Sequence, residues 1–128
     1  MEIVVVTHGE MSQGLLHSCN MYYGKLHNVH AISLLQDMNI NEFKKEFNEF
    51  VDKLGNRILI LCDVNGGTPY NTACEYKKNT LEKEIAVMTG VNLPMIIDSI
   101  ERTNSTVDLG ELCNEIMVNT MTGIKIVQ

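Results

Sequence analysis

Two short apolar runs, each followed by a polar residue that can do chemistry, constrain the fold of this chain more than any other feature. The run over residues 3–6 ends two positions before His8, and the run over residues 58–62 is followed directly by Asp63. Unbroken apolar runs are typical of parallel strands that helices cover on both faces. Ligands and reactive groups gather at the carboxyl ends of such strands. The sequence therefore predicts that His8 and Asp63 lie at the functional edge of a parallel sheet.

The rest of the chain alternates between apolar and amphipathic segments, with no internal repeat and no linker. This alternation predicts an α/β fold, a doubly wound and mostly parallel sheet with helices on both faces. If the first and third strands are neighbours, His8 and Asp63 flank the point where the strand order reverses. Strands are expected over residues 2–6, 29–35, 57–62 and 84–89, and helices are expected to start near Ser12, Asn41, Thr68, Asn92 and Asp108.

Length and composition exclude several classes of protein. A chain of 128 residues has the size of one domain, so we predict a single domain over residues 1–128. The net charge of -6 argues against nucleic acid as the partner, because such binders carry a basic surface. No apolar stretch approaches the ~20 residues of a membrane span, so we expect no membrane insertion. The four cysteines lack C-x-x-C spacing, which favours reduced thiols and a cytoplasmic location.

The turn Gly66-Gly67-Thr68-Pro69 follows the third expected strand and is a candidate phosphoryl-binding site. Two glycines allow a ligand to approach the backbone closely, and a following helix presents unpaired N–H groups to an anion. Thr68 adds a hydroxyl that can cap the helix or contact a phosphoryl oxygen. The same turn is also common as a plain connection between a strand and a helix. Its glycine spacing matches neither nucleotide fingerprint, so a nucleotide site is not supported.

Four histidines are present, and His8 differs from the others by its position at a strand end. His17 lies within an expected helix, and His27 and His30 flank the second strand, where surface or capping roles are expected. No pair of residues has the spacing of a zinc site, so no metal is expected. From the residues alone, His8 is either a nucleophile that Asp63 orients or a loop histidine without a chemical role.

Three segments together resemble the enzyme IIA domain of the mannose-type (mannose/fructose/sorbose) sugar phosphotransferase system. They are Thr7-His8-Gly9, the stretch over residues 63–71, and the stretch over residues 90–95. The resemblance implies a phosphohistidine carrier that receives a phosphoryl group from HPr and passes it to enzyme IIB during sugar uptake. It implies no metal, nucleotide or other cofactor. Since the sequence ends at Gln128, without a linker and IIB domain, we expect a free-standing IIA subunit.

The roles implied by the resemblance fall on individual positions. His8 matches the phosphorylated histidine, Asp63 matches the aspartate that hydrogen-bonds its ring, and Thr68 matches a hydroxyl residue that can contact the phosphoryl oxygens. Gly66 and Gly67 complete the expected phosphoryl-binding turn. Family members often have an aromatic residue where this chain has Asn65, a difference that we expect to alter the rim that faces the partner.

The apolar segment Ile124–Val127 predicts a short terminal strand, which cannot be stable without a neighbouring strand. In the resembling family this strand crosses to a second subunit and pairs antiparallel with its sheet. We therefore expect a strand-exchanged homodimer, with folding back onto the same chain's sheet as the alternative.

Two other functions remain open on the sequence. The first is the IIA-like subunit that serves dihydroxyacetone kinase, which also carries a histidine after its first strand. The second is a regulatory module that binds an anion without transferring a phosphoryl group. The identity of the phosphoryl acceptor, enzyme IIB or the kinase subunits, separates the first function from a sugar phosphotransferase IIA. Absence of phosphate on His8 after incubation with HPr, enzyme I and phosphoenolpyruvate would favour the second function.

Overall fold

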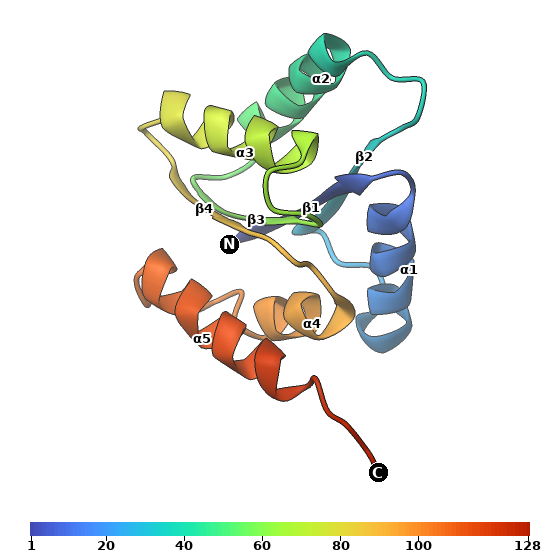
Figure 1. Ribbon diagram of the computed structural model, residues 1–128. Coiled ribbons are helices and arrows are strands. Elements are labelled where there is room, and N and C mark those ends of the chain that lie inside the picture. Colours follow the sequence, from blue (N-terminus) through green and yellow to red (C-terminus); the bar gives the residue numbers. More distant parts are fainter.

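A four-stranded parallel sheet lies at the centre of the molecule, which the computed structural model describes over residues 1–128 (Figure 1). The strands lie in the spatial order β2-β1-β3-β4, so β1 and β3 are neighbours and the order reverses between them. All three strand pairings are parallel. The predicted doubly wound parallel fold is confirmed. Its strands are β1 (Glu2–His8), β2 (Val29–Leu34), β3 (Arg57–Cys62) and β4 (Glu84–Met88).

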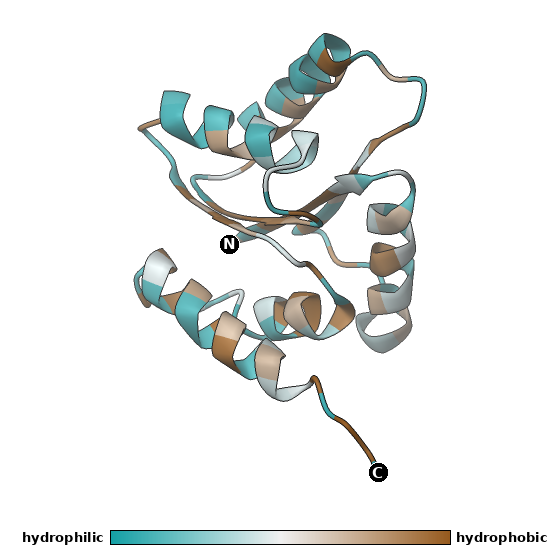
Figure 2. Ribbon diagram, in the orientation of Figure 1, coloured by the Kyte–Doolittle hydropathy of each residue, from teal (hydrophilic) through white to brown (hydrophobic).

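Helices cover both faces of this sheet because its central strands are apolar on both sides. Ile3 and Val5 of β1 point into one core, and Val4 and Val6 point into the other. Figure 2 shows much of the central strands in the brown of hydrophobic residues, and a mixture of teal and brown on the surrounding helices. None of the helices has the length and apolar character that crossing a bilayer requires. One face packs against α1 (Met11–Tyr23), α4 (Leu93–Glu101) and α5 (Leu109–Thr122), and the other against α2 (Ile40–Asp52) and α3 (Thr68–Asn79).

The helix starts follow side-chain capping where a suitable residue is present. Asn92 and Asp108 cap α4 and α5 as the sequence predicts. For α2 the cap is Asn39 rather than Asn41, because the Asn39 backbone is extended and its side chain accepts the Asn41 N–H at 2.8 Å. Ser12 does not cap α1 either, since it lies inside the helix with its hydroxyl bonded to β2.

The C-terminal segment does not fold back onto the sheet of its own chain, which was the alternative to strand exchange. Residues 124–128 form no strand and run away from the sheet in the single chain (Figure 1). Ile124, Ile126 and Val127 are 77%, 87% and 95% exposed. A strand needs a neighbour for its backbone hydrogen bonds, and this segment lies beside none in a single chain. The exchanged dimer stays a prediction.

Candidate functional site

The ends of β1 and β3 bring His8 and Asp63 together. Val6 pairs with Cys62 across the two strands, so the residues just beyond them meet at the same sheet edge. The Nδ1 atom of His8 lies 2.8 Å from Oδ2 of Asp63. The backbone N–H of His8 donates to the same oxygen, also at 2.8 Å. One carboxylate therefore holds both the backbone and the ring of His8.

The Asp63 carboxylate is suited to remain ionised. Its side chain is only 8% exposed, and its second oxygen, Oδ1, accepts the N–H of Val64 at 2.9 Å. Burial by itself would raise the pKa of Asp63, but the hydrogen bonds from His8 and Val64 outweigh it and lower that pKa below its ordinary value of 3.8. Asp63 is thus an anionic acceptor at neutral pH, and it has no proton to donate to the ring.

This electrostatic arrangement assigns the tautomer of His8. Because an ionised carboxylate only accepts hydrogen bonds, the Nδ1 atom must carry the proton in their contact. In the neutral ring the lone pair then lies on Nε2. The His8 side chain is 50% exposed, so a reactant from outside the molecule can reach it. The pair therefore combines an anchored ring with an accessible nucleophilic nitrogen.

The glycine turn meets the His8 ring at Gly67. A Cβ added at Gly67 would lie 2.9 Å from Cε1 and 3.6 Å from Nε2 of His8, so only glycine leaves this space open. The N–H of Gly67 donates to the carbonyl of Val64 at 3.2 Å, which engages it within the turn. The contribution that the structure shows for Gly67 is therefore space beside the ring.

Other groups of this turn retain their capacity to bind an anion. Gly66 has a φ of 81°, a conformation that favours glycine. The N–H groups of Gly66 and Thr68 find no acceptor within the chain. Gly67 rather than Thr68 occupies the position before α3, and no side chain caps this helix. The Thr68 hydroxyl thus does not act as the cap that we predicted.

A cleft of about 500 Å³ adjoins His8 and Thr68. Its apolar wall comes from the end of β2 and the start of α2, and the sequence analysis did not assign these residues to the site. The only sequence signal is the pair of apolar residues Leu35 and Met38 in an otherwise polar connection, and such a pair does not by itself predict a site. The wall residues are Leu34, Leu35, Met38 and Ile40.

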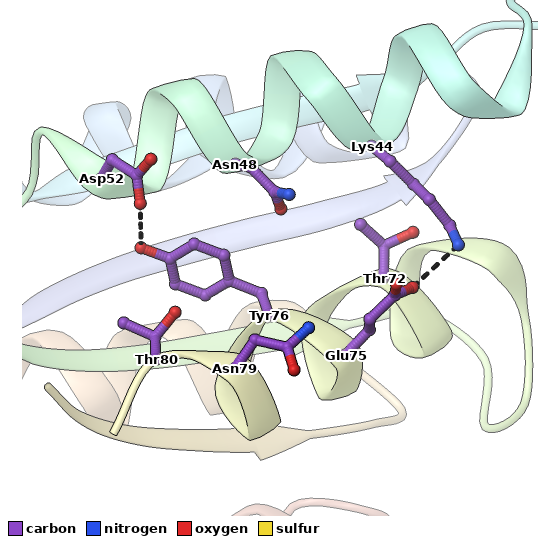
Figure 3. A pocket seen from close by; sticks show the side chains of 8 residues that line it. All are labelled: Lys44, Asn48, Asp52, Thr72, Glu75, Tyr76, Asn79 and Thr80. Atoms are coloured by element: carbon purple, nitrogen blue, oxygen red, sulfur yellow. Dashed lines mark hydrogen bonds and ion pairs between the residues drawn. The ribbon is translucent and has the colours of Figure 1, made fainter. Parts of the chain in front are cut away.

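A second hollow is the polar groove between α2 and α3 (Figure 3), and His8 is not among the residues that line it. Its volume is about 210 Å³. Its side chains largely bind one another: the Tyr76 hydroxyl donates to Asp52 at 2.7 Å, and Lys44 pairs with Glu75 at 2.8 Å. These pairs join the two helices, so the four side chains have a structural role in this groove.

The remaining histidines and cysteines do not join this site. His17 and His27 are exposed, and His30 pairs with Glu2 at 2.7 Å. The structure contains no group of three or more His, Cys, Asp or Glu side chains arranged around a metal. Burial, with smaller effects of Cys74 and Asp63, raises the pKa of Cys62 to about 12. This thiol stays protonated, so it does not compete with His8 as a nucleophile.

Residues 2–117 match the family described as the PTS system fructose IIA component, where PTS is the sugar phosphotransferase system. A PTS system mannose-specific EIIAB component of Escherichia coli strain K12 is 30% identical over 113 residues, which cover 86% of this chain and 34% of that protein. The chain thus spans about a third of the length of this relative.

Two further comparisons cover nearly the whole of both chains. A PTS system sorbose-specific EIIA component of Lacticaseibacillus casei is 28% identical over 126 residues, covering 91% of this chain and 83% of that protein. Among solved structures, the phosphotransferase system component EIIA of Streptococcus agalactiae aligns with a TM-score of 0.90 at 26% identity. That alignment covers 98% of this chain and 95% of the other chain.

Proposed function

Because the chain belongs to the family of sugar phosphotransferase IIA components of the mannose and fructose type, we propose that it is a phosphohistidine carrier. In this proposal His8 accepts a phosphoryl group from phosphorylated HPr and passes it to enzyme IIB. The observation that carries the proposal is the contact between His8 and Asp63, which anchors Nδ1 at 2.8 Å and leaves Nε2 accessible.

The proposed step is an in-line displacement at phosphorus. The Nε2 lone pair of His8 forms a bond to phosphorus while the bond between phosphorus and the donor protein breaks, and that electron pair leaves with the donor. As the ring gains positive charge, the Asp63 carboxylate stabilises it through the Nδ1–H hydrogen bond. Transfer to enzyme IIB reverses the step, with His8 as the leaving group. Phosphoryl transfer of this kind needs positioning and charge stabilisation more than further protein chemistry.

The start of α3 supplies groups that can hold the phosphoryl oxygens. The unpaired N–H groups of Gly66 and Thr68 and the positive end of the helix favour an anion beside Nε2. Thr68 shares its cleft with His8, so its hydroxyl is available as an additional donor. These contacts stabilise the transferring group without a metal ion.

The surface around His8 supports direct docking of protein partners. Four large apolar side chains near the carboxyl ends of the strands are about half exposed, and exposed apolar surface beside a reactive group fits contact with a protein partner. Transfer from one protein to another requires such contact, because the two nitrogens must approach the same phosphorus. HPr and enzyme IIB would use this surface in turn. The four residues are Met11, Leu35, Ile40 and Val64, with exposed fractions of 45%, 45%, 52% and 55%.

Assembly and location complete the proposal. The exposed apolar tail, residues 124–127, would pair antiparallel with the sheet of a second copy and form a homodimer. We place the carrier in the cytoplasm, where its proposed donor HPr acts.

The test is incubation of the purified protein with phosphoenolpyruvate, enzyme I and HPr. We expect acid-labile phosphate on the wild type and on His17→Ala, and none on His8→Ala. The labelled protein is then offered to enzyme IIB and, separately, to the subunits of dihydroxyacetone kinase. Retention of label by His8→Ala would refute the assignment of His8, and transfer only to the kinase subunits would refute the proposed acceptor.

A further inference from the structure

Directly behind His8, three hydroxyl side chains form a cluster that the proposed mechanism does not use. Thr7 precedes His8 on β1, Ser33 lies opposite Thr7 on β2, and Ser12 lies in the first turn of α1. Thr7 and Ser12 are completely buried. Thr7 faces the core under α1, whereas His8 lies toward the opposite face of the sheet because side chains alternate along a strand. The cluster therefore adjoins the site without contacting a reactant.

The hydrogen bonds of the cluster form a defined chain. The Thr7 hydroxyl oxygen accepts the backbone N–H of Ser12 at 2.8 Å. The Ser12 hydroxyl lies 3.0 Å from the carbonyl of Ile32 and 3.0 Å from the Ser33 hydroxyl. A carbonyl only accepts and Ser12 has a single hydroxyl proton, so Ser12 donates to Ile32 and Ser33 donates to Ser12.

This chain closes the short loop that runs from His8, the last residue of β1, to α1. Thr7 and Ser12 lie on either side of the loop, and their bond joins its two ends. Within the loop, the N–H of Gly9 donates to the carbonyl of Leu34 at 2.8 Å, and the N–H of His8 donates to Asp63. The loop is thus held to β3 on one side, to β2 on the other, and to α1 through Thr7. The side chain of Glu10, the residue before α1, does not cap the helix. Thr7 therefore accepts the N–H of Ser12, a donor at the helix start that would otherwise be unpaired.

We propose that Thr7 is a positioning residue for phosphoryl transfer, which holds the backbone of His8 so that Nε2 stays aligned with the incoming phosphorus. This inference rests on the proposed function of His8. A displacement of a reacting group by about 1 Å can cost on the order of 100-fold in rate, so a loop bond one residue away from the nucleophile affects the reaction. If Thr7 only stabilised the fold, removal of its hydroxyl would lower the resistance to unfolding and leave the transfer step intact.

The variant Thr7→Val keeps the size of the side chain and removes the acceptor for Ser12. We expect its rate of phosphoryl transfer at saturating phospho-HPr to fall about tenfold, with the KM for the donor within about twofold of the wild type. Thr7→Ser retains the hydroxyl and should recover most of the rate. The matched control is Thr120→Val, the same change at a buried threonine of α5 whose hydroxyl has no partner. This control should transfer at the wild-type rate.

A second measurement does not depend on phosphorylation. The nitrogen shifts of the His8 ring and the amide exchange of Gly9, both followed by NMR, report the loop directly. We expect Thr7→Val to accelerate the exchange of Gly9 at least about tenfold and to alter the His8 ring shifts, with no change in Thr120→Val. If Thr7→Val does not fold, Ser33→Ala removes only the last donor of the chain and should show the same changes at smaller size.

The two measurements separate the possible failures. If the wild type takes no phosphate, the proposed function fails, while the ring shifts and amide exchange still decide whether Thr7 positions His8. If Thr7→Val only lowers Tm, with wild-type ring shifts, Gly9 exchange and transfer rate, Thr7 is a stabilising residue and the inference is overturned.

Discussion

Gly67 offers the sharpest prediction, because one added methyl group meets the proposed nucleophile. The Cβ of Gly67→Ala would lie 2.9 Å from Cε1 of His8, whereas carbon atoms pack comfortably at about 3.5–4.0 Å. The ring must therefore move by roughly 0.6–1 Å. The φ of Gly67 is -74°, which any residue adopts, so the substitution strains no backbone.

The two consequences differ in size. Since the clash falls on the far end of a half-exposed side chain, the ring can rotate outward, and we expect a loss of only about 1 kcal/mol in the free energy of unfolding. The same rotation stretches the bond of 2.8 Å between Nδ1 and Asp63 and displaces Nε2. We therefore expect the transfer rate to fall about 10- to 100-fold.

Two quantities are measured: the rate of phosphoryl transfer from phospho-HPr, and the stability of the protein to thermal unfolding. The control is Gly14→Ala, the same substitution inside α1, because a Cβ at Gly14 meets no atom within 4 Å. It should raise stability by about 0.5–1 kcal/mol and leave transfer unchanged. A wild-type transfer rate in Gly67→Ala, together with unchanged His8 ring shifts, would refute the view that Gly67 reserves space for the ring.

Three more predictions test the site and its surroundings. Asp63→Asn presents an N–H donor where one oxygen now accepts, so transfer should slow about 10- to 100-fold, equivalent to the ~1.5–3 kcal/mol of a hydrogen bond to a charged group. The pKa of Asp63 is lower in the folded state than its ordinary value of 3.8. The stability that this carboxylate contributes is therefore complete above pH 3.8 and is lost as the pH falls through the lowered pKa of the folded state. Asp63→Asn should lack this loss in acid unfolding. Burial, followed by the hydrogen bond to Asp52, raises the pKa of Tyr76 to about 12. The contribution of Tyr76 to stability is therefore complete below pH 10 and is lost as the pH rises toward 12. Tyr76→Phe should lower the free energy of unfolding by about 1 kcal/mol, remove this alkaline loss and leave the transfer rate unchanged. Truncation after Thr122 should convert a dimer into a monomer in sedimentation experiments, and a full-length chain that sediments as a monomer at micromolar concentration would contradict the exchange.

The features predicted well from sequence are those that depend on local pattern. The bounds of β3 match because the apolar run over residues 58–62 lies between Arg57, which follows a turn, and the polar residue Asp63. The contact between His8 and Asp63 follows from two strand ends at one sheet edge, together with the neighbouring positions of β1 and β3. Parallel strands share the direction of their carboxyl ends, so this contact needs only the strand order.

The features that sequence missed depend on tertiary distances. That Gly67 faces the His8 ring follows from where α3 begins relative to β1, and no periodicity encodes it. The bond from Ser12 to Thr7 depends on the path of the loop between them, so the sequence indicated Ser12 only as a cap. The strand predicted for the apolar tail requires the sheet of a second copy as its neighbour, so it stays a prediction.

The most direct test of the central claim is to locate the phosphorus on His8 by NMR of the phosphorylated protein labelled with ¹⁵N. Because Asp63 holds Nδ1 at 2.8 Å, we expect coupling between ³¹P and Nε2 of His8, with the Nδ1 proton still bonded to Asp63. Phosphorus on Nδ1, or on any other histidine, would contradict this expectation.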